Sequence, residues 1–121
     1  MKKHPLAALL FAFVAASAST VRAEGPSSAE DIEAGRVLSL RICTACHLVS
    51  RDQDTTPILR PPAPSFASIA NRRGATEEGV RQFLRTTHST VRNLNSMPNP
   101  ALTDDQIRQA AAFLMSLKKR P

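Results

Sequence analysis

Residues 35–47 read Gly-Arg-Val-Leu-Ser-Leu-Arg-Ile-Cys-Thr-Ala-Cys-His and join the end of a predicted helix to a Cys-x-x-Cys-His motif. The helix is predicted over residues 28–42, because apolar residues recur there at three- and four-residue spacing on one face. Gly35 lies on that face, although glycine costs a helix roughly 1 kcal/mol relative to alanine. We therefore expect another element to approach this helix closely at Gly35.

Capping signals predict where the first and last helices begin. Ser27 is followed three residues later by Glu30, which is the spacing of a capping box. Thr103 and Gln106 repeat that spacing ahead of a strongly amphipathic segment near the C-terminus. The last helix is therefore predicted to begin directly after Thr103.

Two shorter helices are predicted between these ends, over residues 65–72 and 77–87. The stretches 48–64 and 89–102 are rich in Pro, Asn and Asp and are predicted to be loops. No segment shows the alternation of a half-buried strand. The fold class predicted from these patterns is all-α.

The first 23 residues differ from the rest and are typical of a secretory signal peptide. A basic start precedes an apolar run of eleven residues, whereas a membrane-spanning helix needs roughly 20. Cleavage is predicted after Ala23, with Ala18 as the alternative position and an uncleaved tether as the alternative outcome. The expected product is one domain, residues 24–121, exported to a bacterial periplasm without stable membrane insertion.

The charge of the exported part is lower than that of the full chain. Removing Lys2, Lys3 and Arg22 from the 16 basic residues leaves 13 against 10 acidic residues, a net charge of +3 instead of +6. No basic run carries interleaved aromatic residues, so we expect no nucleic-acid partner. A basic face toward an acidic protein partner is compatible with this balance.

The Cys-x-x-Cys-His motif is typical of covalent c-type haem attachment. Cysteines three apart can meet the two vinyl groups of one porphyrin edge, so Cys43 and Cys46 are the predicted attachment points and His47 the predicted iron ligand. A thioredoxin-like motif would need a preceding strand, and a zinc site would need a fourth ligand, for which only His88 remains outside the signal. A disulfide across so short a loop is the third alternative.

A second axial ligand for the iron has three candidates, Met97, Met115 and His88. Met115 falls within the last helix, where a core role as a gap filler is expected. His88 ends a predicted helix and is expected at the surface. Met97 lies in a proline-stiffened loop that can press a thioether against a flat ring, so we predict that Met97 is the ligand.

The chain resembles the class I cytochrome c family over nearly all of its exported part. The segments that carry the resemblance are residues 35–38, 43–47, 63–66, 97–98 and 111–117. The resemblance implies a small cytochrome c fold of three to four helices around one covalent haem c, with the N- and C-terminal helices crossing at Gly35 against Phe113. It also implies that the carbonyl of Pro64 accepts the second ring N–H of His47. Since the chain has no Trp or Tyr, Arg72, Arg73 or Arg92 are the candidates to bind the propionates.

The function implied is that of an electron carrier and not of an enzyme. His47 and Met97 would fill both axial positions of the iron, so a substrate would have no place to bind. The expected apolar neighbours of the haem are Phe66, Ile69, Leu84 and Leu94. We expect a monomer that docks transiently on redox proteins. The alternatives are a subunit dedicated to a periplasmic dehydrogenase or oxidase, and a haem sensor with an open sixth position.

Overall fold

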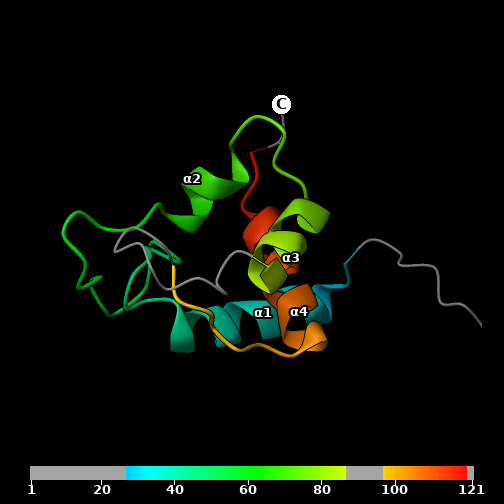
Figure 1. The fold of residues 1–121 in the computed structure, drawn as a ribbon, viewed down its shortest axis with the longest axis horizontal. Coiled ribbons are helices and arrows are strands. Elements are labelled where there is room, and N and C mark those ends of the chain that lie inside the picture. Colours follow the sequence, from blue (N-terminus) through cyan, green and yellow to red (C-terminus); the bar gives the residue numbers. More distant parts are fainter. Residues whose placement is uncertain (1–26, 87–96, 120–121) are drawn as a thin grey trace, which may run out of the picture.

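Four helices make up the part of the chain that the computed structural model describes, residues 27–86 and 97–119 (Figure 1). In chain order they are α1 (Ala29–Ile42), α2 (Phe66–Ala70), α3 (Glu77–Thr86) and α4 (Asp104–Ser116). No strand occurs in these two ranges, and the predicted all-α class is confirmed. The predicted signal peptide lies outside the described residues.

The start of α1 differs by one residue from the prediction. Ser28 is the N-cap, because its hydroxyl accepts a hydrogen bond from the Asp31 N–H at 3.1 Å. Ser27 was predicted in this role, and that prediction is wrong. The Ser27 hydroxyl donates instead to the Glu77 carboxylate at the start of α3, at 2.7 Å. Ser28 therefore caps the start of α1, while Ser27 links this end of α1 to α3.

The other helix ends follow their capping residues. Thr103 accepts from the Gln106 N–H and Gln106 accepts from the Thr103 N–H, so the predicted capping box of α4 is confirmed. At α3, Thr76 accepts from the N–H of Gly79. The helix predicted over residues 65–72 is shorter, ending at Ala70, where the Asn71 side chain bonds the helical carbonyl of Ala67 at 2.7 Å.

The packing of α1 on α4 dominates the fold, and α2 and α3 also pack against α4 (Figure 1). At the crossing, a Cβ on Gly35 would overlap the backbone carbonyl of Gln109 and would lie 2.9 Å from the Cβ of Phe113. The close approach predicted at Gly35 is confirmed. Only a residue without a side chain permits the two backbones to come this near.

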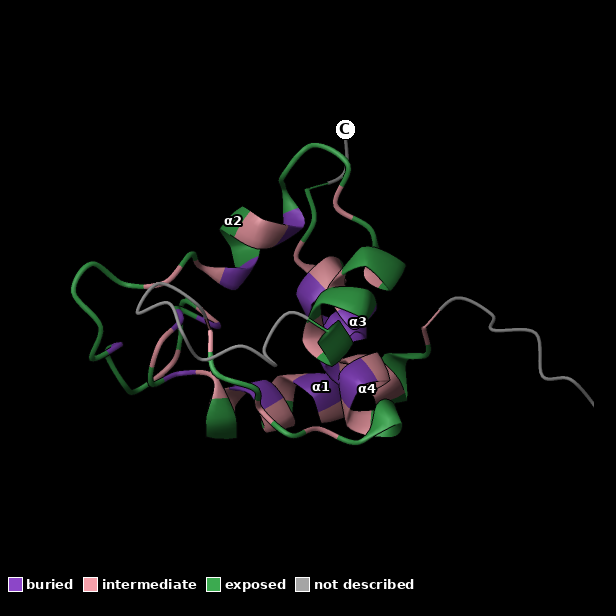
Figure 2. Ribbon diagram, in the orientation of Figure 1, coloured by how far each residue is buried: buried purple, intermediate pink, exposed green. Residues whose placement is uncertain are grey.

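The core lies where the helices meet, and the buried surfaces of α1 and α4 face each other in Figure 2. Its buried apolar cluster joins the loop after the motif to α2 and α4; the members are Val49, Phe66, Ala70, Phe113 and Leu114. The rings of Phe66 and Phe113 are 6.2 Å apart between centroids. Aromatic pairs at this distance stabilise a core beyond the area they bury.

A surface ion pair also links α1 to α4. Arg108 of α4 lies 2.5 Å from the carboxylate of Asp31 in the first turn of α1. The hydrogen bond from Arg108 holds the pKa of Asp31 below its ordinary value. A carboxyl with a depressed pKa in the folded state adds stability above its ordinary pKa, and this contribution is lost as the pH falls through the lowered value.

Asp31→Asn is therefore expected to lower the urea midpoint of unfolding at pH 7 and to have much less effect near pH 3. The measurement is urea unfolding of both proteins at the two pH values. Glu30→Gln is the matched control, since Glu30 lies in the same turn and forms no ion pair with the described residues. An Asp31→Asn effect of equal size at both pH values would contradict the prediction.

Candidate functional site

The Cys-x-x-Cys-His motif continues directly from the last turn of α1. The Cys43 N–H still bonds the carbonyl of Ser39 at 2.9 Å, as in a helix. The N–H groups of Cys46 and His47 both turn back to the Cys43 carbonyl, at 3.2 and 2.9 Å. These bonds form a compact turn, so the two cysteines and the histidine are presented together at the end of the helix.

His47 is held by a backbone carbonyl seventeen residues further along the chain. His47 is 8% exposed, and its Nδ1 lies 2.7 Å from the carbonyl oxygen of Pro64. Because a carbonyl oxygen only accepts, Nδ1 carries the hydrogen and the lone pair of the neutral ring is at Nε2. His47 is thus oriented as a metal ligand through Nε2.

The loop that supplies Pro64 is paired with the motif through its backbone. The Ala63 N–H donates to the Cys46 carbonyl at 3.1 Å, and the Phe66 N–H donates to the Leu48 carbonyl at 3.0 Å. An isolated bridge between His47 and Ala63 belongs to the same pairing. Pro64 lies between these two bonds, which fixes its carbonyl opposite the imidazole.

Phe66 supports the imidazole from the side. Its ring meets the His47 ring edge-on, with 5.6 Å between centroids and 64° between planes. Since Phe66 also packs on Phe113 of α4, the position of the imidazole is coupled to the helical core. The ring therefore has one hydrogen bond and one aromatic contact to restrict its rotation.

Both cysteines are free and partly buried. Burial raises the pKa of the Cys43 thiol to about 11, although the nearby Ser39 hydroxyl acts in the opposite direction. Cysteines in thioredoxin-like motifs have lowered pKa values, so Cys43 does not have the environment of a redox thiol. The helix before the motif also replaces the strand that such a motif requires.

The zinc alternative has no support in the part of the chain that the structure describes. No group of three or more His, Cys, Asp or Glu side chains there is placed to hold a metal ion. The fourth ligand considered from the sequence, His88, lies outside the described residues.

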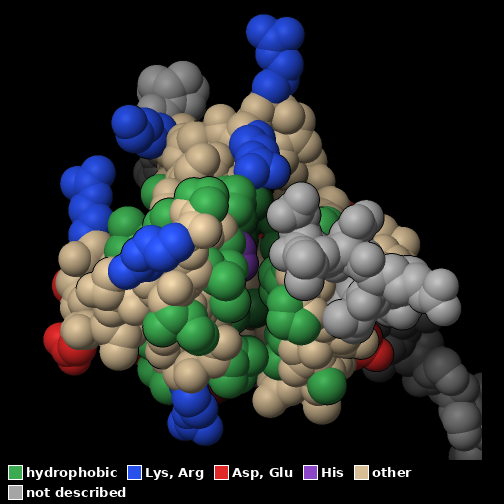
Figure 3. Space-filling view, turned by 60° about the vertical axis from the view of Figure 1, so that its left-hand side comes forward, with side chains coloured by type: hydrophobic (Ala, Val, Ile, Leu, Met, Phe, Trp, Pro, Cys, Tyr) green, Lys and Arg blue, Asp and Glu red, His purple; other side chains and the backbone are tan. Residues whose placement is uncertain are grey.

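A hollow opens on the face that carries the site, walled by hydrophobic side chains with a histidine at its base (Figure 3). His47 is the one histidine within the described ranges. Lys and Arg side chains surround this face, while Asp and Glu lie toward the edges of the view. A concave apolar surface with a single oriented polar group is the form of a cofactor site.

The other residues predicted from the sequence lie away from the motif in the chain. Met97 is half-buried at the start of the described segment that leads into α4, and Met115 packs against the buried core cluster as predicted for a gap filler. Arg72 and Arg73 are exposed beyond the end of α2. Arg92 and Leu94 lie outside the described residues.

Two buried polar residues at the site were not singled out from the sequence. Ser39 is fully buried one turn before Cys43, and Thr44 within the motif is 9% exposed and donates to the Leu40 carbonyl at 3.2 Å. The four-residue spacing of Gly35, Ser39 and Cys43 places all three on one face of α1. That spacing was a signal that could have found Ser39.

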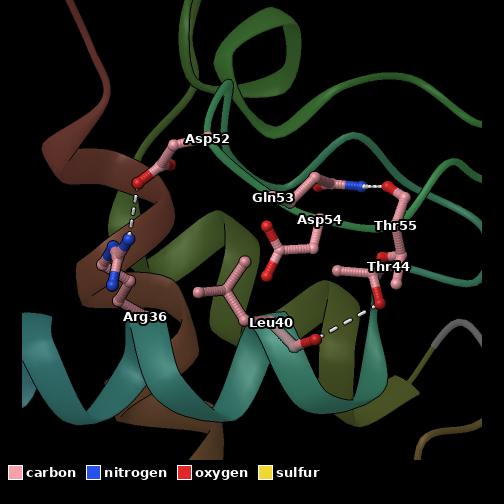
Figure 4. A pocket seen from close by; sticks show the side chains of 7 residues that line it. All are labelled: Arg36, Leu40, Thr44, Asp52, Gln53, Asp54 and Thr55. Carbon is pink, nitrogen blue, oxygen red and sulfur yellow. Dashed lines mark hydrogen bonds and ion pairs between the residues drawn. The ribbon is translucent and has the colours of Figure 1, made fainter.

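A separate polar pocket of about 250 Å³ lies against the second half of α1. It is lined by Arg36, Leu40, Thr44 and residues 52–55, and Figure 4 shows Arg36 reaching across to Asp52. The ion pair between them spans 2.9 Å. Neither cysteine nor His47 lines this pocket, so it is distinct from the candidate site.

A covalently bound haem fits this site. The site supplies two free thiols, an imidazole whose Nδ1 is held by the Pro64 carbonyl, and an apolar hollow. The helical fold and this site define a small c-type haem protein. Residues 32–118 match the family model described as cytochrome c, and the chain belongs to the cytochrome c family, of class I. Members of this family carry haem c and transfer electrons, and this chain is a haem c protein of that kind.

One relative from the curated proteins supports the assignment. The chain is similar to cytochrome c-552 of Bradyrhizobium diazoefficiens, with 28% identity over 110 residues that cover 91% of this chain and 90% of the relative. No solved structure gives a significant match.

Proposed function

We propose that the protein is a periplasmic electron carrier in which Cys43 and Cys46 attach the haem and His47 and Met97 are the axial ligands. The observation that carries the proposal is the 2.7 Å contact between the His47 Nδ1 and the Pro64 carbonyl. This contact leaves only Nε2 of the ring available to a metal. When bound, the haem supplies a reversible one-electron couple between Fe(III) and Fe(II).

The protein residues would set the properties of that couple. A carbonyl that accepts the Nδ1–H raises the basicity of a ligating imidazole. A thioether from Met97 is a soft ligand that favours Fe(II) and raises the potential. The apolar surroundings supplied by Phe66 and Ile69 favour the less charged iron state, because burial penalises charge.

The inference that the protein is exported rests on the composition of its first 23 residues. Within residues 27–86 and 97–119, no helix is long and apolar enough to cross a membrane. We infer that the haem is attached in the periplasm and that the protein then docks transiently, as a monomer, on an electron donor and an acceptor. The resemblance to exported cytochromes supports this inference.

Met97→Ala is expected to abolish the weak far-red sulfur-to-iron absorption band that the oxidised wild type should show. The measurement is the optical spectrum of both proteins after expression with haem-attachment machinery. Loss of the thioether also removes its preference for Fe(II), so the reduction potential of the variant should fall.

Met115→Leu is the matched control, since Met115 packs on the core and the substitution nearly conserves volume. It should keep the far-red band. The carrier function would be contradicted if the oxidised wild type lacked the band and the reduced wild type bound carbon monoxide readily. The protein would then be a haem sensor with an open sixth position.

A further inference from the structure

Ser39 carries a buried hydroxyl that has no hydrogen-bond partner among the described residues. The residue lies in α1 one turn before Cys43 and is completely shielded from solvent. A hydroxyl that is buried without a partner costs free energy, so such groups are rare in folded proteins. The Ser39 hydroxyl therefore needs an acceptor in the working protein.

The usual acceptor for a serine inside a helix is the carbonyl four residues earlier, which for Ser39 is that of Gly35. The Ser39 hydroxyl does not bond this carbonyl. The neighbouring Thr44 does make this kind of bond, because its hydroxyl donates to the Leu40 carbonyl at 3.2 Å. The hydroxyl of Ser39 is thus left for another acceptor on its own face of α1.

The Cys43 sulfur is an acceptor on that face. Residues four apart lie one above the other on a helix, and the Cys43 N–H still bonds the Ser39 carbonyl at 2.9 Å, so the helical spacing continues to the cysteine. The side chains also interact, since burial raises the pKa of the Cys43 thiol and the Ser39 hydroxyl lowers it. Bulk water does not compete at Ser39, which is fully buried.

Haem attachment changes what the Cys43 sulfur can do in a hydrogen bond. A thiol is both a weak donor and a weak acceptor. Its addition to a vinyl group forms a carbon–sulfur bond and moves the thiol hydrogen to the other vinyl carbon, with no atom lost. The thioether sulfur that results has lone pairs but no hydrogen, so of the two side chains only Ser39 can then donate.

We propose that in the haem-loaded protein the Ser39 hydroxyl donates a hydrogen bond to the thioether sulfur of Cys43, which positions that sulfur and raises the reduction potential. The inference rests on the proposed function, because it requires haem attachment at Cys43. The effect on the potential follows from the direction of the hydroxyl dipole. Its positive end would face the cofactor edge, where it disfavours the additional positive charge of Fe(III), and the low dielectric of a buried site strengthens this effect.

The first test is a redox titration of the holoprotein followed by its optical spectrum. Ser39→Ala should lower the reduction potential and shift the equilibrium with a reference couple about twofold toward Fe(III), which is within the contribution of one neutral hydrogen bond. Ser39→Thr keeps the hydroxyl and should stay close to the wild-type potential. A hydroxyl bonded to the Gly35 carbonyl would turn its oxygen to the cofactor, so a higher potential in Ser39→Ala would overturn the proposal, as would an unchanged one.

The second test observes the hydrogen bond directly, by NMR of the reduced holoprotein. A buried hydroxyl proton in a hydrogen bond exchanges slowly with water, so we expect a resonance from Ser39 with nuclear Overhauser contacts to the β-protons of Cys43. The resonance should be absent in Ser39→Ala. Contacts to Gly35 in place of Cys43, or exchange too fast for any resonance, would overturn the proposal.

Thr44→Val is the matched control for the titration. Thr44 is 9% exposed and adjoins Cys43, but its hydroxyl is already donated to the Leu40 carbonyl. Its removal should not lower the potential. An equal fall in Thr44→Val would show that the loss of any buried hydroxyl near the motif has this effect, and the role assigned to Ser39 would be lost.

The mass of the denatured wild type separates failure of this proposal from failure of the proposed function. If the chain keeps one haem on denaturation and exchanges electrons reversibly, but Ser39→Ala changes nothing, the carrier function stands and the Ser39 hydrogen bond does not. If the haem is released on denaturation, Cys43 carries no thioether, and both proposals are overturned.

Discussion

Gly35→Val is expected to lower the free energy of unfolding by about 3 kcal/mol or more, the upper range for overpacking a core. The reason is that the first carbon of any side chain at this position would overlap the backbone carbonyl of Gln109 in α4. Backbone atoms of a packed helix cannot rotate aside as a side chain can. The measurement is urea unfolding of the holoprotein followed by circular dichroism, with Gly35→Ala expected between wild type and Gly35→Val.

Gly79→Ala is the matched control, because among the residues that the structure describes a Cβ there would meet only the Thr76 hydroxyl, at 3.1 Å. Its effect should be small. Combining Gly35→Val with Gln109→Ala tests the cause, since the overlap is with the backbone and truncating the side chain of Gln109 should not restore stability. Recovery in that double variant, or wild-type stability of Gly35→Val, would show that the two helices cross less closely.

His47→Gly is expected to reduce the yield of haem-loaded, low-spin protein on the order of tenfold or more, since loss of even an outer-shell partner can cost 10–100-fold. The substitution removes the only described imidazole of the hollow and leaves the Pro64 carbonyl without its donor. The measurement is the haem absorption spectrum per unit of protein. Added imidazole should restore a low-spin spectrum in whatever fraction retains the cofactor.

His88→Gln serves as the control and should keep the wild-type spectrum. If His88→Gln lost the low-spin spectrum while His47→Gly retained it, the assignment of the iron ligand would pass to His88. A variant that changes neither the yield nor the spectrum would remove His47 from the site.

Most of the helical architecture could be predicted because its signals are local. The apolar stripe of α4 and the reciprocal capping by Thr103 and Gln106 each depend on residues within one or two turns. The misassigned N-cap of α1 shows the limit of such signals. Ser27 and Ser28 both offer a hydroxyl, and Ser27 is drawn away by Glu77, fifty residues further along the chain.

The candidate site, too, could be predicted only in part. The motif residues and Met97 were singled out from spacing and side-chain chemistry, whereas the Pro64 carbonyl was implied only by resemblance to a family. Every residue has a backbone carbonyl, so no pattern in the sequence marks the one that will reach an imidazole. The stretch 48–64 was likewise predicted only to be a loop, since prolines predict a loop and not the segment against which it packs.

The helix pattern, the capping box of α4 and the Cys-x-x-Cys-His turn follow from the amino-acid sequence alone, because each arises from atoms within a few residues of one another. The tertiary structure decided which groups from distant segments meet. Packing of α1 on α4 places Gly35 against the Gln109 backbone, and pairing of the loop with the motif brings Pro64 to His47. Such contacts depend on the shape of the whole core, which no local spacing encodes.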